Sequence, residues 1–248
     1  MDKYGLIGYP LGHSFSISYH NQRFADEGIN AKYFNFEIPS IEDLPAVLGQ
    51  NPELKGLNVT IPYKEKVLPF LDYISPEARA IGAVNVIKII HEGKKTTLKG
   101  YNSDVIGFTQ SIEPMLESHH KKALVLGTGG ASKAVAYGLQ SLGLEAIFVS
   151  RYQRPGTIQY EQITPEVVKE YNVIVNCTPL GMSPNSDTCP QLPYEALDER
   201  NILYDLIYNP DETLFMRLGA ERGANVNNGL EMLLLQAFAS WEFWMGKD

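Results

Sequence analysis

The chain has 248 residues, of which 44% are hydrophobic, and it carries a formal net charge of -8 at pH 7. This size allows one large domain or two small ones, and the acidic balance excludes a general nucleic-acid binder, because such proteins carry a basic surface. The two cysteines, Cys177 and Cys189, fit neither a metal-binding spacing nor a disulfide framework, which favours a cytoplasmic protein. Residues 1–5 contain no apolar signal segment, and no apolar run is long enough to cross a membrane.

The first hundred residues alternate predicted strands and helices. We predict strands at 4–7, 32–36 and 56–60, helices at 18–27 and 41–48, and a hairpin of 83–90 and 96–98. The third strand stops at Pro62, because proline lacks the amide hydrogen that a central strand needs. This alternation indicates a largely parallel sheet covered on both faces, to which the hairpin adds antiparallel pairing.

A second alternating series follows. It contains predicted strands at 123–126, 146–149, 173–176 and 202–206, and helices at 105–116, 131–142, 213–222 and 230–244. We therefore expect an α/β protein of two α/β domains with a cleft between them, the first with a mixed sheet and the second with a Rossmann-type sheet.

A glycine-rich turn, Gly127-Thr128-Gly129-Gly130-Ala131-Ser132, lies between a predicted strand and a predicted helix. This context is typical of a dinucleotide-binding turn, in which the first glycine permits the tight turn and the second lets the pyrophosphate approach the helix N-terminus. Ser132 replaces the third glycine or alanine of the usual pattern. A tight turn that binds no ligand is the alternative.

The loop after the strand at 146–149 indicates which cofactor is bound. NAD-binding folds usually place an acidic residue there, whereas this chain has Arg151 and Arg154. A guanidinium suits a 2′-phosphate by charge and by geometry, so we expect NADP. Two surface arginines without a ligand are the alternative, and it weighs more against Arg154 than against Arg151.

Lys64 and Asp104 are candidates for proton transfer. Lys64 lies just beyond the strand that stops at Pro62, and ligands bind at the carboxyl ends of strands in open α/β sheets. Burial lowers the pKa of a lysine and a neighbouring aspartate raises it, so both could tune Lys64 for proton exchange during hydride transfer. A solvated lysine is one alternative, and helix capping by Asp104 or Ser103 is the other.

Other polar residues fall in unexpected places. Asn85 interrupts an apolar predicted strand, where a polar residue needs a partner, and the loop Gly12–Ser16 offers hydroxyls to a polyol or a carboxylate. His119 and His120 precede a lysine in a predicted turn and are expected to be solvated. No metal is expected, because no ligand spacing joins His13, His20, His91, His119 and His120.

Together these stretches resemble shikimate dehydrogenase from end to end. The resemblance is carried by Gly12–Ser16, Asn58–Lys64, Gly82–Asn85, Asn102–Asp104, Gly127–Ser132, Asn176–Met182, Tyr204–Pro210, Gly229-Leu230 and Gln236-Ala237. No single motif decides it, but their order and spacing are specific.

The resemblance implies reversible, NADP-linked oxidation of shikimate to 3-dehydroshikimate, a step in making chorismate. It implies a catalytic pair, Lys64 and Asp104, and a substrate site of Ser14, Ser16, Asn58, Thr60, Asn85, Tyr208 and Gln236. The implied cofactor-binding residues are Gly127, Gly129, Gly130, Ala131, Ser150, Arg151, Arg154, Thr178 and Gly229. It also implies a discontinuous substrate-binding domain, 1–102 completed by 229–248, and a cofactor domain at 103–228.

The chain departs from the family pattern in a few places. Ile17 stands where a proline is usual, Ser103 stands where threonine is frequent, and the loops around 154–164 are short. Three other functions stay open: a quinate/shikimate dehydrogenase of broader substrate or cofactor use, an oxidoreductase such as methylenetetrahydrofolate dehydrogenase, which also uses a lysine, and a non-catalytic binding module. We expect a monomer or homodimer that binds a small molecule.

Overall fold

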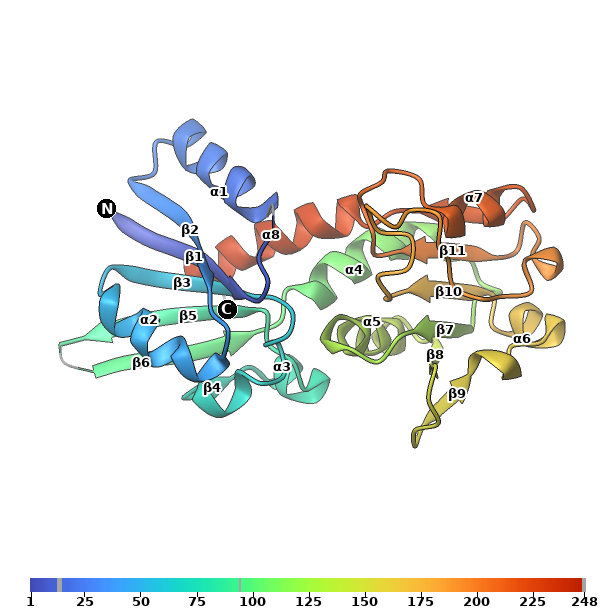
Figure 1. Ribbon diagram of the computed structural model, residues 1–248, viewed down its shortest axis with the longest axis horizontal. Coiled ribbons are helices and arrows are strands. Elements are labelled where there is room, and N and C mark those ends of the chain that lie inside the picture. The colour runs from blue at the N-terminus through green and yellow to red at the C-terminus, as the bar shows by residue number, and fades with distance from the viewer. Residues whose placement is uncertain (13–14, 94, 247–248) are drawn as a thin grey trace. The chain divides into compact units, whose positions relative to one another are not determined.

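The computed structural model describes residues 1–12, 15–93 and 95–246, which form two compact units (Figure 1). Unit 1 comprises the described residues of Met1–Ser103 and Ala237–Asp248, and unit 2 comprises Asp104–Gln236. The division therefore falls inside the last helix, α8 (Leu230–Trp244). Assignment of all of 229–248 to a substrate-binding domain stays a prediction.

Unit 1 is built on a mixed six-stranded sheet with the order β2-β1-β3-β5-β6-β4. The strands are β1 (Asp2–Gly8), β2 (Ala31–Glu37), β3 (Leu54–Val59), β4 (Tyr73–Ile74), β5 (Val86–Glu92) and β6 (Lys95–Tyr101). β1 pairs in parallel with β2 and β3, whereas β5 pairs antiparallel with β3 and β6. The predicted mixture of parallel strands and an antiparallel hairpin is confirmed.

Helices cover both faces of this sheet. α1 (Phe15–Asp26) and the end of α8 lie on one face, and α2 (Leu44–Gln50) and α3 (Pro76–Ile81) lie on the other (Figure 1). The first pair buries an aromatic cluster, and the second packs on aliphatic side chains. Gly56 on β3 makes room for the end of α8, since a Cβ there would lie 2.4 Å from the Trp244 ring. The indole nitrogen of Trp244 donates to the Ile87 carbonyl at 3.1 Å, which fixes the helix on the sheet.

Unit 2 contains a fully parallel sheet with the order β12-β11-β10-β7-β8-β9. The strands are β7 (Lys122–Leu126), β8 (Glu145–Ser150), β9 (Thr157–Gln159), β10 (Val173–Asn176), β11 (Ile202–Asp205) and β12 (Asn225–Asn227). Counted from β7, this is the strand order 3-2-1-4-5-6 of a Rossmann fold, whose ligands bind where the order reverses, here between β7 and β10. The predicted Rossmann-type sheet is confirmed.

Helices cover both faces of this second sheet. α4 (Asp104–Ile112) and α5 (Gly130–Ser141) contribute to the core on one face, and α6 (Pro165–Glu170) and α7 (Leu214–Ala220) to the core on the other. The strands are apolar on both sides, as in β7, where Val125 and Leu126 face opposite cores. Burial on both faces explains why the sequence here shows continuous apolar runs rather than alternation.

The structure corrects the sequence-based reading in several places. The short elements β4, β9, β12, α3 and α6 have at most six residues each, too few to give a periodic pattern. The start of α3 does carry a local signal, because Ser75 caps it and Pro76 follows. His120 is buried rather than solvated, and its Nδ1 accepts from the Glu117 amide at 2.8 Å.

Candidate functional site

The lysine candidate follows a tight turn at the end of β3. The amide of Tyr63 donates to the Thr60 carbonyl at 2.9 Å, which closes the turn around Pro62. The Tyr63 ring is buried, and the carbonyl of Lys64 accepts from the Val84 amide at 2.8 Å. The backbone that carries the half-buried Lys64 is therefore fixed on both sides.

Asn85 lies immediately before β5 rather than inside the strand, which begins at Val86. Its Oδ1 accepts from the Ser103 amide at 2.7 Å, and its Nδ2 donates to the Ser103 hydroxyl at 2.9 Å. Asn102 Nδ2 donates to the carbonyl of Ala83, in the loop between α3 and β5, at 3.0 Å. These bonds fix the main chain up to the residue that precedes Asp104.

Asn58 belongs to a buried network in unit 1. The Tyr33 hydroxyl donates to Asn58 Oδ1 at 2.8 Å, and Asn58 Nδ2 donates to the Ser240 hydroxyl at 2.9 Å. The hydroxyls of Ser240 and Ser103 lie 3.1 Å apart. Burial raises the pKa of Tyr33, and a hydrogen bond from Ser16 partly offsets this. The network thus joins three predicted substrate-binding residues, Ser16, Asn58 and Asn85.

The other predicted substrate-site and catalytic residues divide between the units. Thr60 is half-buried in unit 1, where its amide donates to a β1 carbonyl at 2.9 Å, and Ser14 lies outside the described residues. Asp104 is the first residue of α4 and is buried. Tyr208 follows β11 and is 38% exposed, and Gln236 lies on α8. The last three belong to unit 2.

The glycine-rich turn leaves the N-terminus of α5 open. Gly127 has φ +109°, a conformation that favours glycine, and a Cβ there would lie 3.4 Å from the Cys177 carbonyl. Gly129 is the N-cap of α5, no described side chain caps it, and a Cβ there would meet no atom within 4 Å. Ser132 is buried and its hydroxyl donates to the Gly129 carbonyl at 2.6 Å. Open amides at a helix N-terminus fit a pyrophosphate.

Both candidate arginines lie on the loop after β8, and both are exposed. The guanidinium of Arg154 donates to the Thr128 hydroxyl in the glycine-rich turn at 3.2 Å. Arg151 instead lies 5.8 Å from the centre of the Tyr152 ring. Ser150 is buried, and its hydroxyl accepts from the Tyr152 amide at 3.2 Å. The structure therefore places Arg154, which the sequence favoured less, beside the turn.

Thr178 is held by the side chain of Asn176, and Gly229 by packing against the main chain. Asn176 Oδ1 accepts from both the amide and the hydroxyl of Thr178, at 3.0 Å and 2.7 Å. Gly229 packs against the main chain after β11, where a Cβ would lie 2.1 Å from the Leu206 carbonyl oxygen. Only glycine fits at residue 229 without a shift of the backbone.

Comparison with known proteins identifies the family. Residues 6–87 match a family described as the shikimate dehydrogenase substrate binding domain. A relative from Carboxydothermus hydrogenoformans named shikimate dehydrogenase (NADP(+)) is 41% identical, over 98% of this chain and 91% of the relative. The chain belongs to the shikimate dehydrogenase family. The predicted family is therefore confirmed.

Solved structures of the family have the same fold. A shikimate 5-dehydrogenase from Thermus thermophilus, in complex with NADP(H) and shikimate, is 32% identical with a TM-score of 0.86, covering 99% of this chain and 94% of that one. A quinate dehydrogenase from Corynebacterium glutamicum, in complex with NAD, is 26% identical with a TM-score of 0.86, covering 99% and 94%. The fold is thus shared by enzymes with different named substrates and cofactors.

Sequence reasoning gave no role to three residues that support the predicted site: Tyr33, Ser240 and Asp205. Tyr33 lies on a strand with several aromatic residues and Ser240 on an apolar helix, so each pattern predicts packing only. Asp205 stands in one of the motifs that carry the family resemblance, and a carboxylate at the end of a buried strand was a signal that could have been used.

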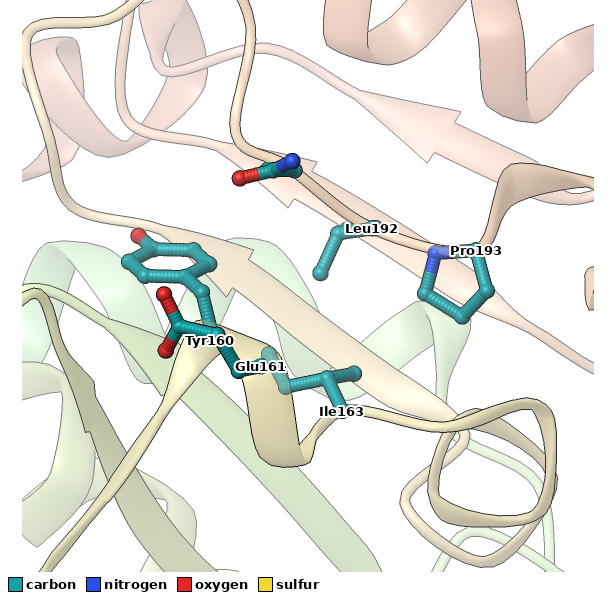
Figure 2. Close-up of a pocket in the computed structure, with 6 residues that line it drawn as sticks. Tyr160, Glu161, Ile163, Leu192 and Pro193 are labelled. Atoms are coloured by element: carbon teal, nitrogen blue, oxygen red, sulfur yellow. The ribbon is translucent and has the colours of Figure 1, made fainter.

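A separate pocket of about 230 Å³ lies in unit 2 beyond the end of β9. Figure 2 shows Tyr160 and Glu161 on one side of it and Leu192 and Pro193 on the other. Burial raises the pKa of Tyr160 to about 12, and Arg151 opposes this shift. None of the predicted site residues lines the pocket.

Proposed function

We propose that the protein is an NADP-dependent shikimate dehydrogenase, which reversibly reduces 3-dehydroshikimate to shikimate. The observation that carries this proposal is the similarity over 98% of the chain to enzymes named shikimate dehydrogenase (NADP(+)). The chain also has Lys64 and Asp104 at the motif positions for which the family resemblance implies a catalytic pair. The role is in the biosynthesis of chorismate and aromatic amino acids.

Unit 2 binds the cofactor in this proposal, and bound NADPH would supply the hydride for the reduction, or bound NADP⁺ would accept it in the reverse direction. The open amides at the start of α5 would bind the pyrophosphate, with Gly127, Gly129, Gly130 and Ala131 forming the turn. Arg151 and Arg154 would bind the 2′-phosphate, and the 3.2 Å bond from Arg154 to Thr128 supports a position beside the turn. Ser150, Thr178 and Gly229 would complete the binding surface.

The proton moves through Lys64 in this proposal. Its ammonium would exchange a proton with the oxygen at the reacting carbon, and Asp104 would hold both Lys64 and a ring hydroxyl. The fixed backbone at Lys64 supports this role, because a proton donor has to be placed within hydrogen-bond reach of its target. No metal ion is needed for this step.

The predicted substrate-binding residues would each bind the substrate group that suits their chemistry. The hydroxyls of Ser14 and Ser16 would bind the carboxylate, and the amides of Asn85 and Gln236 would bind ring hydroxyls, together with Thr60. Tyr208 would lie near the carboxylate. Asn58 is held by Tyr33 and Ser240, which supports a role beside the substrate in positioning the network.

A quinate/shikimate dehydrogenase is the second candidate, since the quinate dehydrogenase of Corynebacterium glutamicum shares the fold. An acidic residue after the second cofactor strand is typical of NAD-binding folds, and this chain has Arg151 there. The arginine favours NADP, and with it the biosynthetic enzyme. The presence of both Lys64 and Asp104 argues against a non-catalytic module.

We propose a cytoplasmic setting because both cysteines are free thiols in the structure. In the described part of the chain, no helix is long and apolar enough to span a membrane. A monomer or a homodimer is proposed for the assembly, with a small molecule as the binding partner.

The test is to mix the purified protein with shikimate or quinate and with NADP⁺ or NAD⁺, in all four combinations, and to follow the absorbance of the reduced nicotinamide. We expect fast turnover with shikimate and NADP⁺ and slow turnover in the other three mixtures. Comparable turnover with quinate or NAD⁺ would favour the second candidate, and no turnover in any mixture would contradict both.

A further inference from the structure

Asp205 is a fully buried carboxylate at the carboxyl end of β11. Its Oδ1 accepts from Asn176 Nδ2 at 3.0 Å and from the Ile207 amide at 3.1 Å, and its Oδ2 accepts from the Thr213 hydroxyl at 2.7 Å. Among the ion pairs of the described residues, none involves Asp205. A buried carboxylate without a cation is costly, so its three donors indicate a specific task.

The first donor connects Asp205 to the Thr178 turn. Asn176 uses its Nδ2 on Asp205 and also on the Leu180 carbonyl, at 3.2 Å. The same amide accepts both Thr178 bonds through its Oδ1, so the orientation of its side chain decides whether those bonds form. Asp205 therefore fixes the orientation of the side chain that holds Thr178.

The second donor connects Asp205 to the segment that carries Tyr208. The Ile207 amide is bound by Asp205, and the Ile207 carbonyl accepts from the Gly229 amide at 3.0 Å. The main chain between Asp205 and Tyr208 is thereby held against Gly229.

The third donor is the cap of α7. The hydroxyl of Thr213 donates to Asp205 and accepts from the Met216 amide at 3.3 Å, as an N-cap does. Thr213 is itself buried. The carboxylate thus joins three segments that are separated in sequence: the end of β10, the chain after β11 and the start of α7.

We propose that Asp205 is a positioning residue for cofactor binding, which holds Thr178 and Gly229 in the arrangement that NADP requires and also fixes the segment that carries Tyr208. The proposal rests on the proposed function, because those three residues are predicted to face the ligands. An apolar residue at position 205 would leave the three donors unpaired and would no longer hold the three segments together.

The experiment measures NADPH binding by fluorescence titration without substrate, in wild type and three variants. For Asp205→Ala we expect an NADPH Kd about tenfold higher, because three hydrogen bonds are lost. For Asp205→Asn we expect a Kd within about threefold of wild type, since Oδ1 still accepts two bonds and Nδ2 can donate to the Thr213 hydroxyl. KM for NADP⁺ should rise in Asp205→Ala more than KM for shikimate.

The matched control is Asn201→Ala. Asn201 is buried at the opposite end of β11 and makes two side-chain bonds, with the Asp198 amide and the Val168 carbonyl, both at 3.0 Å. Its loss should lower the melting temperature as Asp205→Ala does, but leave the NADPH Kd unchanged. The control separates a local effect on the loops from a general loss of stability.

The proposal is overturned if folded Asp205→Ala binds NADPH like wild type, or if Asn201→Ala loses as much affinity. Should Asp205→Ala fail to fold, Thr213→Val removes one of the three bonds, and an unchanged Kd in that variant overturns the proposal. If wild type binds NADH in place of NADPH, the same comparison is made with NADH, so an error in the proposed cofactor is distinguished from an error about Asp205.

Discussion

Unit 1 and unit 2 each bury a polar network beneath predicted ligand-binding residues, but the two networks differ in chemistry. The bonds described in unit 1 join amides and hydroxyls, those of Tyr33, Asn58 and Ser240 among them. Those in unit 2 converge on the carboxylate of Asp205. Neutral groups hold their bonds at any pH at which the protein is folded, whereas a carboxylate can gain a proton.

Burial shifts the pKa of one ionisable group in each unit, and it does so in opposite directions for His20 in unit 1 and Asp205 in unit 2. His20 in unit 1 stacks on the Tyr33 ring at 4.7 Å, and neither of its ring nitrogens has a hydrogen-bond partner in the described structure. Burial, with a smaller effect of Arg23, lowers its pKa to about 3. Burial raises the pKa of Asp205 to about 6, although its three donors oppose the shift. Both groups therefore favour their neutral forms.

These shifts predict opposite contributions to stability. The folded state keeps His20 neutral, so its contribution is present above the ordinary pKa of 6.5 and is lost as pH falls towards 3. Asp205 contributes fully below its ordinary value of 3.8, and that contribution is lost as pH rises to 6. Acidification from neutral pH should weaken unit 1 through His20 and strengthen unit 2 through Asp205.

The largest expected effect concerns the chemistry assigned to unit 1. Lys64→Ala should lower kcat by about 10²–10⁴ with a smaller change in shikimate affinity, because a proton donor acts mainly in the transition state. Lys66→Ala, which removes a nearby exposed lysine, is the control and should leave kcat unchanged. Steady-state kinetics and a shikimate titration measure both. A loss of affinity with kcat intact would contradict the role of Lys64.

His20→Phe tests the pH dependence of stability that we assign to unit 1. Between pH 7.5 and pH 5.0, we expect the variant to lose about 2 kcal/mol less unfolding free energy than wild type, because it has no imidazole to protonate on unfolding. Urea unfolding at the two pH values gives the difference. An identical pH dependence in both proteins would show that His20 keeps an ordinary pKa when folded.

Asp205→Asn tests the pH dependence of stability that we assign to unit 2, and the expected change is opposite in sign to that of His20→Phe. Over the same pH interval the variant should lose about 1 kcal/mol more unfolding free energy than wild type, since it lacks the proton that Asp205 takes up on acidification. The same urea measurements apply. An identical pH dependence in the variant and in wild type would show that the pKa of folded Asp205 is not raised above its ordinary value.

The smallest expected effect lies within the neutral network. Tyr33→Phe leaves Asn58 Oδ1 without its donor and should cost about 1 kcal/mol of unfolding free energy, equally at both pH values. Combined with Ser240→Ala, the cost should be non-additive, because both hydroxyls bind the Asn58 side chain. Additive costs would show that Asn58 does not couple the two residues.

Local patterns in the sequence predict much of this molecule. The alternation of strands and helices, the turn at Pro62 and the glycine-rich turn before α5 are encoded by neighbouring residues, and each was confirmed as structure. Elements of a few residues, such as β4 and α6, are set by packing and give no periodic signal.

The partners of the buried polar groups could not be predicted in the same way. Asn58 is bound by Tyr33 and Ser240, which lie 25 and 182 residues away along the chain. No local pattern specifies such pairs, because they form only when the sheet and α8 have come together. The same holds for Asp205, whose donors come from three segments.

The central claim is that unit 2 binds NADP and that unit 1 binds shikimate with Lys64 at the reacting oxygen. The most direct test is a crystal structure with NADP⁺ and shikimate bound. We predict the pyrophosphate at the N-terminus of α5, the substrate carboxylate at Ser14 and Ser16, and the Lys64 ammonium within hydrogen-bond reach of the hydroxyl that is oxidised. Shikimate bound away from Lys64, or NADP⁺ bound away from the glycine-rich turn, would contradict the claim.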